Sequence, residues 1–144
     1  MAQRGYSDSY LQALWRKAVK GTYHNRCACS GVAFPCGGAL EAHHVVRRGK
    51  GALRNDFRNG VALCTVHHKW ADTWEGRDYI ESIVDCSYLR AHDVTLPVRL
   101  HELGCTRVEF DRLQRDELTA VIRRAEEGSV CGTHDGSGAR KKGR

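Results

Sequence analysis

Side chains that commonly bind metal ions gather in the first half of the chain. Of eight histidines and seven cysteines, four of each lie between residues 27 and 68. These side chains are Cys27, Cys29, Cys36, His43, His44, Cys64, His67 and His68. Thiolate and imidazole are ligands that zinc prefers, and a neutral imidazole is also a suitable general base near pH 7. The region is therefore predicted to bind metal and to be able to support catalysis.

Within this region, three blocks follow one another along the chain. His43 and His44 are adjacent, and adjacent residues of a strand point to opposite faces, so we expect different roles for the two imidazoles. Asn59 comes next, with an amide that can hydrogen-bond to the backbone or to an imidazole. The third block places one thiol and two imidazoles at the start of a predicted helix: Cys64, His67 and His68. Its Cys-x-x-His spacing is typical of a zinc chelate.

The order of these blocks resembles the motif of the HNH endonucleases, which have a ββα-metal fold. The matching segments are LEAHHVV, DFRNGVALC and LCTVHHKW, and the resemblance covers about residues 26–75. It is similar to phage-type members in which a zinc knuckle braces the nuclease hairpin. The resemblance implies an α+β fold with a two-stranded hairpin and a helix at its core, a zinc knuckle, and flanking helices.

The resemblance also implies a catalytic role for each matching residue. His44 matches the general base that takes a proton from water, and Asn59 matches the residue that orients this base. His43 and His68 match the ligands of a catalytic divalent ion, Mg²⁺ or Mn²⁺. Glu41 shares a strand face with His43 and is expected either to support this site or to be an exposed carboxylate. The implied activity is metal-dependent hydrolysis of DNA phosphodiester bonds, by nicking or by double-strand cleavage.

A structural zinc ion is the second implied cofactor. Cys64 and His67 would supply two ligands, and the upstream cysteines would supply two more. The usual Cys-x-x-Cys of the family is replaced here by Cys27-x-Cys29 and a separate Cys36. Because a Cys-x-Cys chelate is cramped on one tetrahedral ion, we expect Cys29 and Cys36 to bind zinc, with Cys27 as the alternative.

The charge distribution points to a polyanionic partner. Residues 1–70 hold 11 Lys and Arg against 3 Asp and Glu, residues 71–127 hold 8 against 13, and residues 128–144 hold 4 against 1. A cationic face attracts nucleic acid by Coulomb force and counterion release. Five basic side chains of the loop between the strands are expected either to contact the DNA backbone or to be merely solvated: Arg47, Arg48, Lys50, Arg54 and Arg58. The alternative function is a zinc-stabilised DNA-binding module with an inactive nuclease motif.

Hydrophobic periodicity predicts the elements that position these residues. In chain order they are a helix from Ser7 or Asp8 to about Lys20, strands over 39–46 and 60–64, a helix over 65–74, a helix over 78–85, an extended stretch over 94–100 interrupted by Pro97, and a helix over 110–127. Trp70 and Trp74 are four residues apart in the predicted helix over 65–74. We therefore expect both to pack in the core rather than to stack on bases.

The length of 144 residues allows one domain with a tail. We expect residues 1–127 to form a single nuclease domain, with an acidic helical elaboration over 76–127. Residues 128–144 are rich in glycine and basic, which is typical of a disordered tail. The chain lacks a run of about 18 apolar residues and a signal-peptide core, so we expect no membrane association and a cytoplasmic protein of a phage or a bacterium. Both a monomer and a homodimer are compatible with the sequence.

Overall fold

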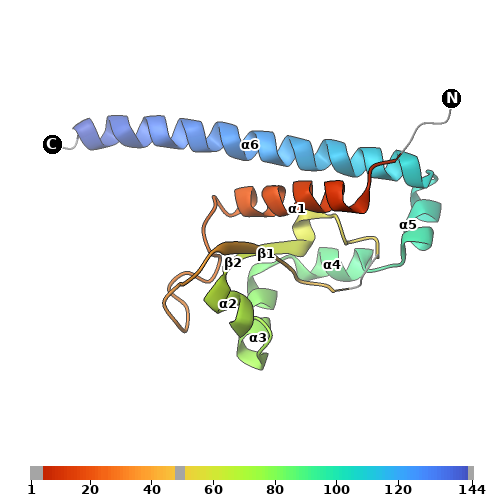
Figure 1. Cartoon of the computed structure of the whole chain (residues 1–144), viewed down its shortest axis with the longest axis horizontal. Coiled ribbons are helices and arrows are strands. Elements are labelled where there is room, and N and C mark those ends of the chain that lie inside the picture. Colours follow the sequence, from red (N-terminus) through yellow and green to blue (C-terminus); the bar gives the residue numbers. More distant parts are fainter. Residues whose placement is uncertain (1–4, 48–50, 143–144) are drawn as a thin grey trace.

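The computed structural model describes residues 5–47 and 51–142, with side chains described as far as Gly128. A two-stranded antiparallel hairpin lies among helices, which confirms the predicted α+β class (Figure 1). In chain order the elements are α1 (Asp8–Thr22), β1 (Leu40–His44), the 3-10 helix η1 (Phe57–Asn59), β2 (Gly60–Cys64), α2 (Thr65–Trp70), α3 (Trp74–Ile83), α4 (Cys86–His92), α5 (Leu96–Leu103) and α6 (Arg107–Lys142).

The hairpin and α2 follow the predicted order of strand, loop, strand and helix. β1 pairs with β2 in a register that sets His44 opposite Gly60 and His43 opposite Val61. α2 begins directly after β2, and the Cys64 side chain caps it by accepting a hydrogen bond from the His67 N–H. α2 therefore leaves the hairpin at the end where Leu40 pairs with Cys64.

One side of the hairpin is covered by α1, which lies beside α6 (Figure 1). Ser7 caps α1, with its hydroxyl accepting a hydrogen bond from the Tyr10 N–H. The core between α1 and α6 consists of buried side chains from both helices: Trp15, Ala18, Val19, Leu118, Val121 and Ile122. A Cβ atom on Gly60 would lie 2.3 Å from a methyl of Val19, so only glycine lets β2 start this close to α1.

A second core joins the other part of the hairpin to α2 and α3. Its buried members are Cys29, Val61, Leu63, Ala71 and Ile80. The aromatic rings of Trp70 and Tyr79 pack against this cluster, with ring centroids 6.0 Å apart. This packing fixes α2, and therefore the histidines that it carries, against the strands.

The prediction that Trp74 packs in the core is wrong. The helix that begins at Thr65 ends at Trp70, and Thr73 caps a new helix by accepting a hydrogen bond from the Gly76 N–H. Trp74 then opens α3 and is 78 % exposed. The four-residue spacing therefore spans two helices and does not place both tryptophans on one face.

The extended stretch predicted over 94–100 is also wrong, because α5 occupies most of it. Thr95 is at the N-cap and Pro97 lies in the first turn, where a missing N–H costs no helical hydrogen bond. Gly104 ends the helix in the left-handed conformation, at φ 65°. Pro97 therefore marks the start of a helix and not the interruption of a strand.

The tail predicted over 128–144 overlaps the end of α6. The side chains beyond Gly128 lie outside the described residues, so this expectation stays a prediction. Among the helices that the structure describes, none is both long and apolar enough to cross a bilayer.

The close approach of α3 to α2 generates a test of the packing. A Cβ atom on Gly76 would lie 2.0 Å from the carbonyl oxygen of Trp70. Because a backbone carbonyl cannot rotate away, we expect Gly76→Ala to lower the free energy of unfolding by about 1–3 kcal/mol, measured by urea denaturation. Gly128→Ala is the matched control, since no described atom lies within 4 Å of its Cβ position. Alanine should stabilise that helical site by up to about 1 kcal/mol, and equal losses in both variants would contradict the packing argument.

Candidate metal centre and active site

A cluster of three thiols and one imidazole lies where the segment before β1 meets the start of α2. Its ligand atoms, from Cys27, Cys36, Cys64 and His67, all lie within 4.8 Å of one another. From Nδ1 of His67 the distances are 3.1 Å to the sulfur of Cys64, 3.5 Å to that of Cys27 and 3.6 Å to that of Cys36. Cys₃His is a donor set typical of structural zinc, so this cluster could hold such an ion.

The orientation of the His67 ring suits a metal ligand. His67 is fully buried, and its Nε2 lies 2.7 Å from the carbonyl oxygen of Val32. A carbonyl only accepts hydrogen bonds, so Nε2 carries the proton and the lone pair of Nδ1 faces the three sulfur atoms. A backbone partner of this kind fixes the tautomer of histidines that bind metals.

The thiols of the cluster differ in their electrostatic surroundings. Burial alone would raise the pKa of Cys64, but hydrogen bonds, first among them those from the backbone N–H groups of His67 and Gly37, lower this pKa to about 6. Desolvation and the neighbouring sulfurs of Cys64 and Cys27 raise the pKa of Cys36 to about 11. Thiolates this close together repel one another, and a divalent cation would remove that repulsion.

The expectation that Cys29 rather than Cys27 belongs to the cluster is wrong. The Ser30 N–H donates to the carbonyl of Cys27, so the chain turns there and carries Cys29 into the second core. Cys29 is fully buried, and burial raises the pKa of its thiol to about 11. The spacing argument correctly allowed only one of the two cysteines, but the turn decides which one.

His43 on β1 and His68 on α2 lie side by side. Their ring centroids are 5.1 Å apart and the ring planes are nearly perpendicular, at 79°. Glu41 accepts a hydrogen bond from Nδ1 of His68 and another from the Thr65 hydroxyl, which leaves the lone pair of His68 Nε2 available. Burial, with the nearby Arg47 charge, lowers the pKa of His43 to about 4. Imidazole is a common ligand of divalent cations, so the two rings form a candidate metal-binding pair.

His44 points to the other face of β1, as the alternation along a strand predicts. Its ring stacks on the indole of Trp15, with centroids 3.8 Å apart and planes inclined by 7°. Nε2 of His44 lies 3.0 Å from the carbonyl oxygen of Arg54, so Nε2 carries the proton and Nδ1 keeps its lone pair. Burial lowers the pKa of His44, which favours the neutral ring. This tautomer can accept a proton at Nδ1.

Asn59 hydrogen-bonds to the backbone of the loop between the strands. Its side chain is fully buried and accepts a hydrogen bond from the Val46 N–H at 2.7 Å. Its amide group donates to the carbonyl of Val46 at 3.0 Å and to that of Leu53 at 3.2 Å. The amide therefore ties the end of β1 to the part of the loop that carries the Arg54 carbonyl.

Arg54 and Arg58, two of the basic side chains expected to contact DNA, pair with carboxylates of α1 and α6. The Arg54 guanidinium binds both carboxylate oxygens of Asp8, each at 2.8 Å. Arg58 pairs with Glu117 at 3.2 Å and lies over the Tyr88 ring, 4.6 Å from its centroid. These contacts hold α1 and α6 to the loop, and the Arg54 and Arg58 side chains are 29 % and 36 % exposed against 58 % for Arg47, so they are less available to DNA. Arg48 and Lys50 lie outside the described residues.

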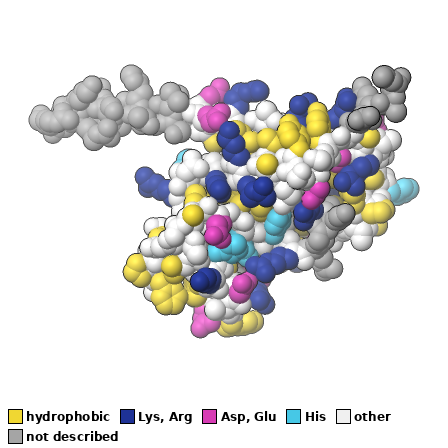
Figure 2. All heavy atoms as spheres, in the orientation of Figure 1, with side chains coloured by type: hydrophobic (Ala, Val, Ile, Leu, Met, Phe, Trp, Pro, Cys, Tyr) yellow, Lys and Arg dark blue, Asp and Glu magenta, His cyan; other side chains and the backbone are white. Residues whose placement is uncertain are grey.

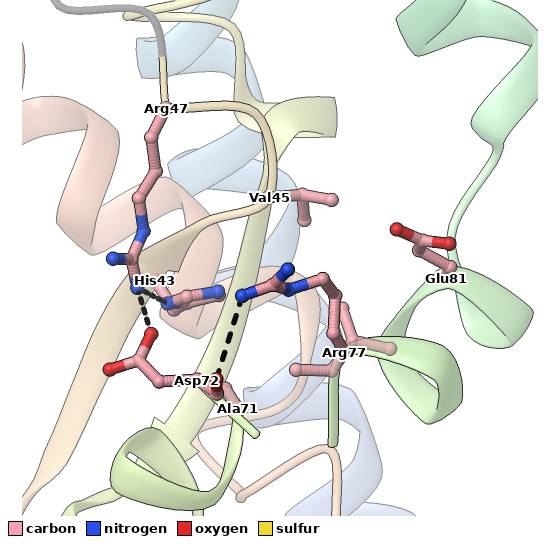
Figure 3. Close-up of a pocket in the computed structure, with 8 residues that line it drawn as sticks. His43, Val45, Arg47, Ala71, Asp72, Arg77 and Glu81 are labelled. Carbon is pink, nitrogen blue, oxygen red and sulfur yellow. Dashed lines mark hydrogen bonds and ion pairs between the residues drawn. The ribbon is translucent and has the colours of Figure 1, made fainter. Parts of the chain in front are cut away.

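A pocket of about 220 Å³ opens beside His43. Arg47 reaches it from the end of β1, with Nη2 lying 3.3 Å from Nδ1 of His43 and 2.8 Å from a carboxylate oxygen of Asp72 (Figure 3). Arg77 reaches it from α3, and Glu81 lines the far wall (Figure 3). Arg77 escaped the sequence analysis because it lies in the acidic part of the chain. Figure 2 shows histidine side chains on one face of the molecule with basic side chains near them.

The cysteine assignment can be tested by metal content. We expect Cys27→Ser to lose bound zinc and to melt at a lower temperature, because a structural zinc ion contributes folding free energy directly. Cys29→Ala should keep its zinc and lose only about 1 kcal/mol of stability from truncation in the core. Zinc per chain and the melting temperature, with and without a chelator, measure both effects. Loss of zinc from Cys29→Ala but not from Cys27→Ser would reverse the assignment.

Comparison with known proteins finds no relative of this chain. No family model matches the chain, and neither the curated proteins nor the solved structures contain a match. A functional proposal for this chain therefore depends on its own residues and their geometry.

Proposed function

We propose that this protein is a metal-dependent endonuclease of the HNH type that hydrolyses phosphodiester bonds in DNA. The observation that carries the proposal is the arrangement of three histidines on β1 and α2. His43 and His68 face each other as a potential metal-binding pair, while His44 is held on the opposite strand face with Nδ1 unprotonated. The order of the three sequence blocks supports the same function.

In this mechanism His44 is the general base. Its Nδ1 takes a proton from the water that attacks the scissile phosphate, while the Arg54 carbonyl holds the ring through Nε2. His43 and His68 would hold a Mg²⁺ or Mn²⁺ ion, which would supply positive charge to stabilise the phosphate oxygens. Glu41 orients His68 through Nδ1 and increases the basicity of its other nitrogen. Asn59 orients the base indirectly, through the loop.

The Cys27, Cys36, Cys64 and His67 cluster has a supporting role in this proposal. Zinc bound there would join the segment before β1 to the end of β2 and the first turn of α2. Because His67 and His68 are adjacent on α2, the ion would also fix the backbone that presents His68. We propose that the cluster is the zinc knuckle of the fold.

Arg47 and Arg77 are the proposed contacts for the DNA backbone. Both guanidinium groups reach the pocket beside His43, from the end of β1 and from α3. Guanidinium groups donate to phosphate oxygens in a fork and carry no base information by themselves. They would therefore position the strand without selecting its sequence.

The activity is tested with supercoiled plasmid in Mg²⁺, Mn²⁺ or EDTA. We expect relaxation or linearisation that needs the divalent ion and falls by about 10²–10⁴-fold in His44→Ala, because the general base is removed. His101→Ala is the control, since His101 is an exposed histidine on α5. Duplex DNA that is bound but never cut in any divalent ion would favour the zinc-stabilised binding module instead.

The backbone contacts are tested by the salt dependence of DNA binding. Each lost phosphate contact lowers the slope of log affinity against log salt by about 0.9. Replacing Arg47 and Arg77 together with alanine should therefore lower the slope by about two units. Arg90→Ala combined with Arg123→Ala removes the same charge from exposed sites on α4 and α6 and should change the slope less. Equal slopes in the two double variants would place the DNA elsewhere.

A further inference from the structure

One face of α1 holds the loop that contacts His44. Asp8, Gln12 and Trp15 lie at helical spacing on this face. The loop residues that they contact are consecutive: Arg54, Asn55 and Asp56. α1 lies outside the residues 26–75 that carry the nuclease-like motif, so its contribution to the site is separate from that motif.

Gln12 contacts the same carbonyl oxygen that His44 uses. Its Nε2 donates to the Arg54 carbonyl at 3.0 Å and to Oδ1 of Asn55 at 2.6 Å. Nε2 of His44 donates to the same Arg54 carbonyl, also at 3.0 Å. Gln12 is only 8 % exposed, and its two amide protons are both used. The direction of this carbonyl is therefore held by a residue of α1.

Trp15 and Asp8 also contact the Arg54–Asp56 segment of the loop. The Trp15 indole N–H donates to the carbonyl of Asp56 at 2.8 Å while its ring stacks on His44. Asp8 binds the Arg54 guanidinium with both carboxylate oxygens. The imidazole is thus enclosed between the indole face and a carbonyl whose own peptide is fixed on α1.

We propose that Gln12 is a positioning residue for the general base, acting with Trp15 and Asp8 to orient His44 and fix its tautomer through the Arg54 carbonyl. The catalytic part of this inference rests on the proposed nuclease function. The structural part does not, because the position and the tautomer of the His44 ring are properties of the protein alone. A peptide plane free to rotate would no longer keep the proton on Nε2, and Nδ1 would lose its lone pair in part of the molecules.

The test is Gln12→Leu in the full chain, followed by ¹⁵N spectra of the histidine rings. We expect wild-type His44 to show the Nε2–H tautomer and Gln12→Leu to show a mixture of tautomers, with the His44→Gln spectrum identifying the signal. On DNA, kcat should fall by roughly ten- to a hundredfold, since misplacement of a catalytic group has costs of this order. KM and DNA affinity should stay within about twofold, because no substrate contact is removed.

Two further variants keep the result interpretable. Lys17→Ala is the control on α1, since Lys17 pairs with Glu126 and its side chain is 64 % exposed, and we expect neither readout to change. Asp8→Asn is the substitute test if Gln12→Leu does not fold, because the Asp8 side chain is 43 % exposed and its replacement disturbs the core less. We expect Asp8→Asn to change the ring spectrum and kcat in the same direction as Gln12→Leu, but by less.

An unchanged His44 ring spectrum in a folded Gln12→Leu protein would overturn the inference, and so would an unchanged kcat in an active enzyme. If the wild type cuts no DNA, the proposed function fails, yet the ring spectra still decide whether Gln12 holds His44.

Discussion

The pairing of β1 with β2 is the constraint on which both candidate sites depend. Its register sets His43 opposite Val61 and His44 opposite Gly60, and it ends where Cys64 meets the start of α2. Side chains alternate along a strand, so a slip of one residue would exchange the faces of His43 and His44. The register is held because all five residues of β2 are buried, and a slip would turn apolar side chains away from their cores.

The loop between the strands is ordered by polar groups that are satisfied internally. Asn59 bridges the two ends of the loop, Asp56 caps η1, and the Tyr88 hydroxyl donates to the Asp56 carboxylate. A buried amide or carboxylate without such partners would cost more than a lost hydrogen bond. The stability of this loop and the orientation of the His44 ring therefore come from the same hydrogen bonds, which explains why α1, α4 and η1 all converge there.

The candidate zinc cluster and the His43–His68 pair share α2 but differ in chemistry. The cluster is rich in sulfur and lies against the second core, whereas the histidine pair is supported by a carboxylate and borders an open pocket. Thiolates select zinc, while imidazole beside carboxylate and water also accepts harder divalent ions. Adjacent residues on one short helix, His67 and His68, thus belong to two candidate sites of different chemistry.

Local spacing was enough to predict the strand, loop, strand and helix, the opposite faces of His43 and His44, and the chelating position of Cys64 and His67. These features depend on neighbours in the chain, whose geometry follows from the period of the strand or helix. Only the tertiary structure decided three other features. These are the choice of Cys27 over Cys29, the internal pairing of Arg54 and Arg58, and the hydrogen bonds from Gln12 to the loop. Arg54 and Arg58 meet carboxylates 46 and 59 residues away, and packing rather than spacing selects such partners.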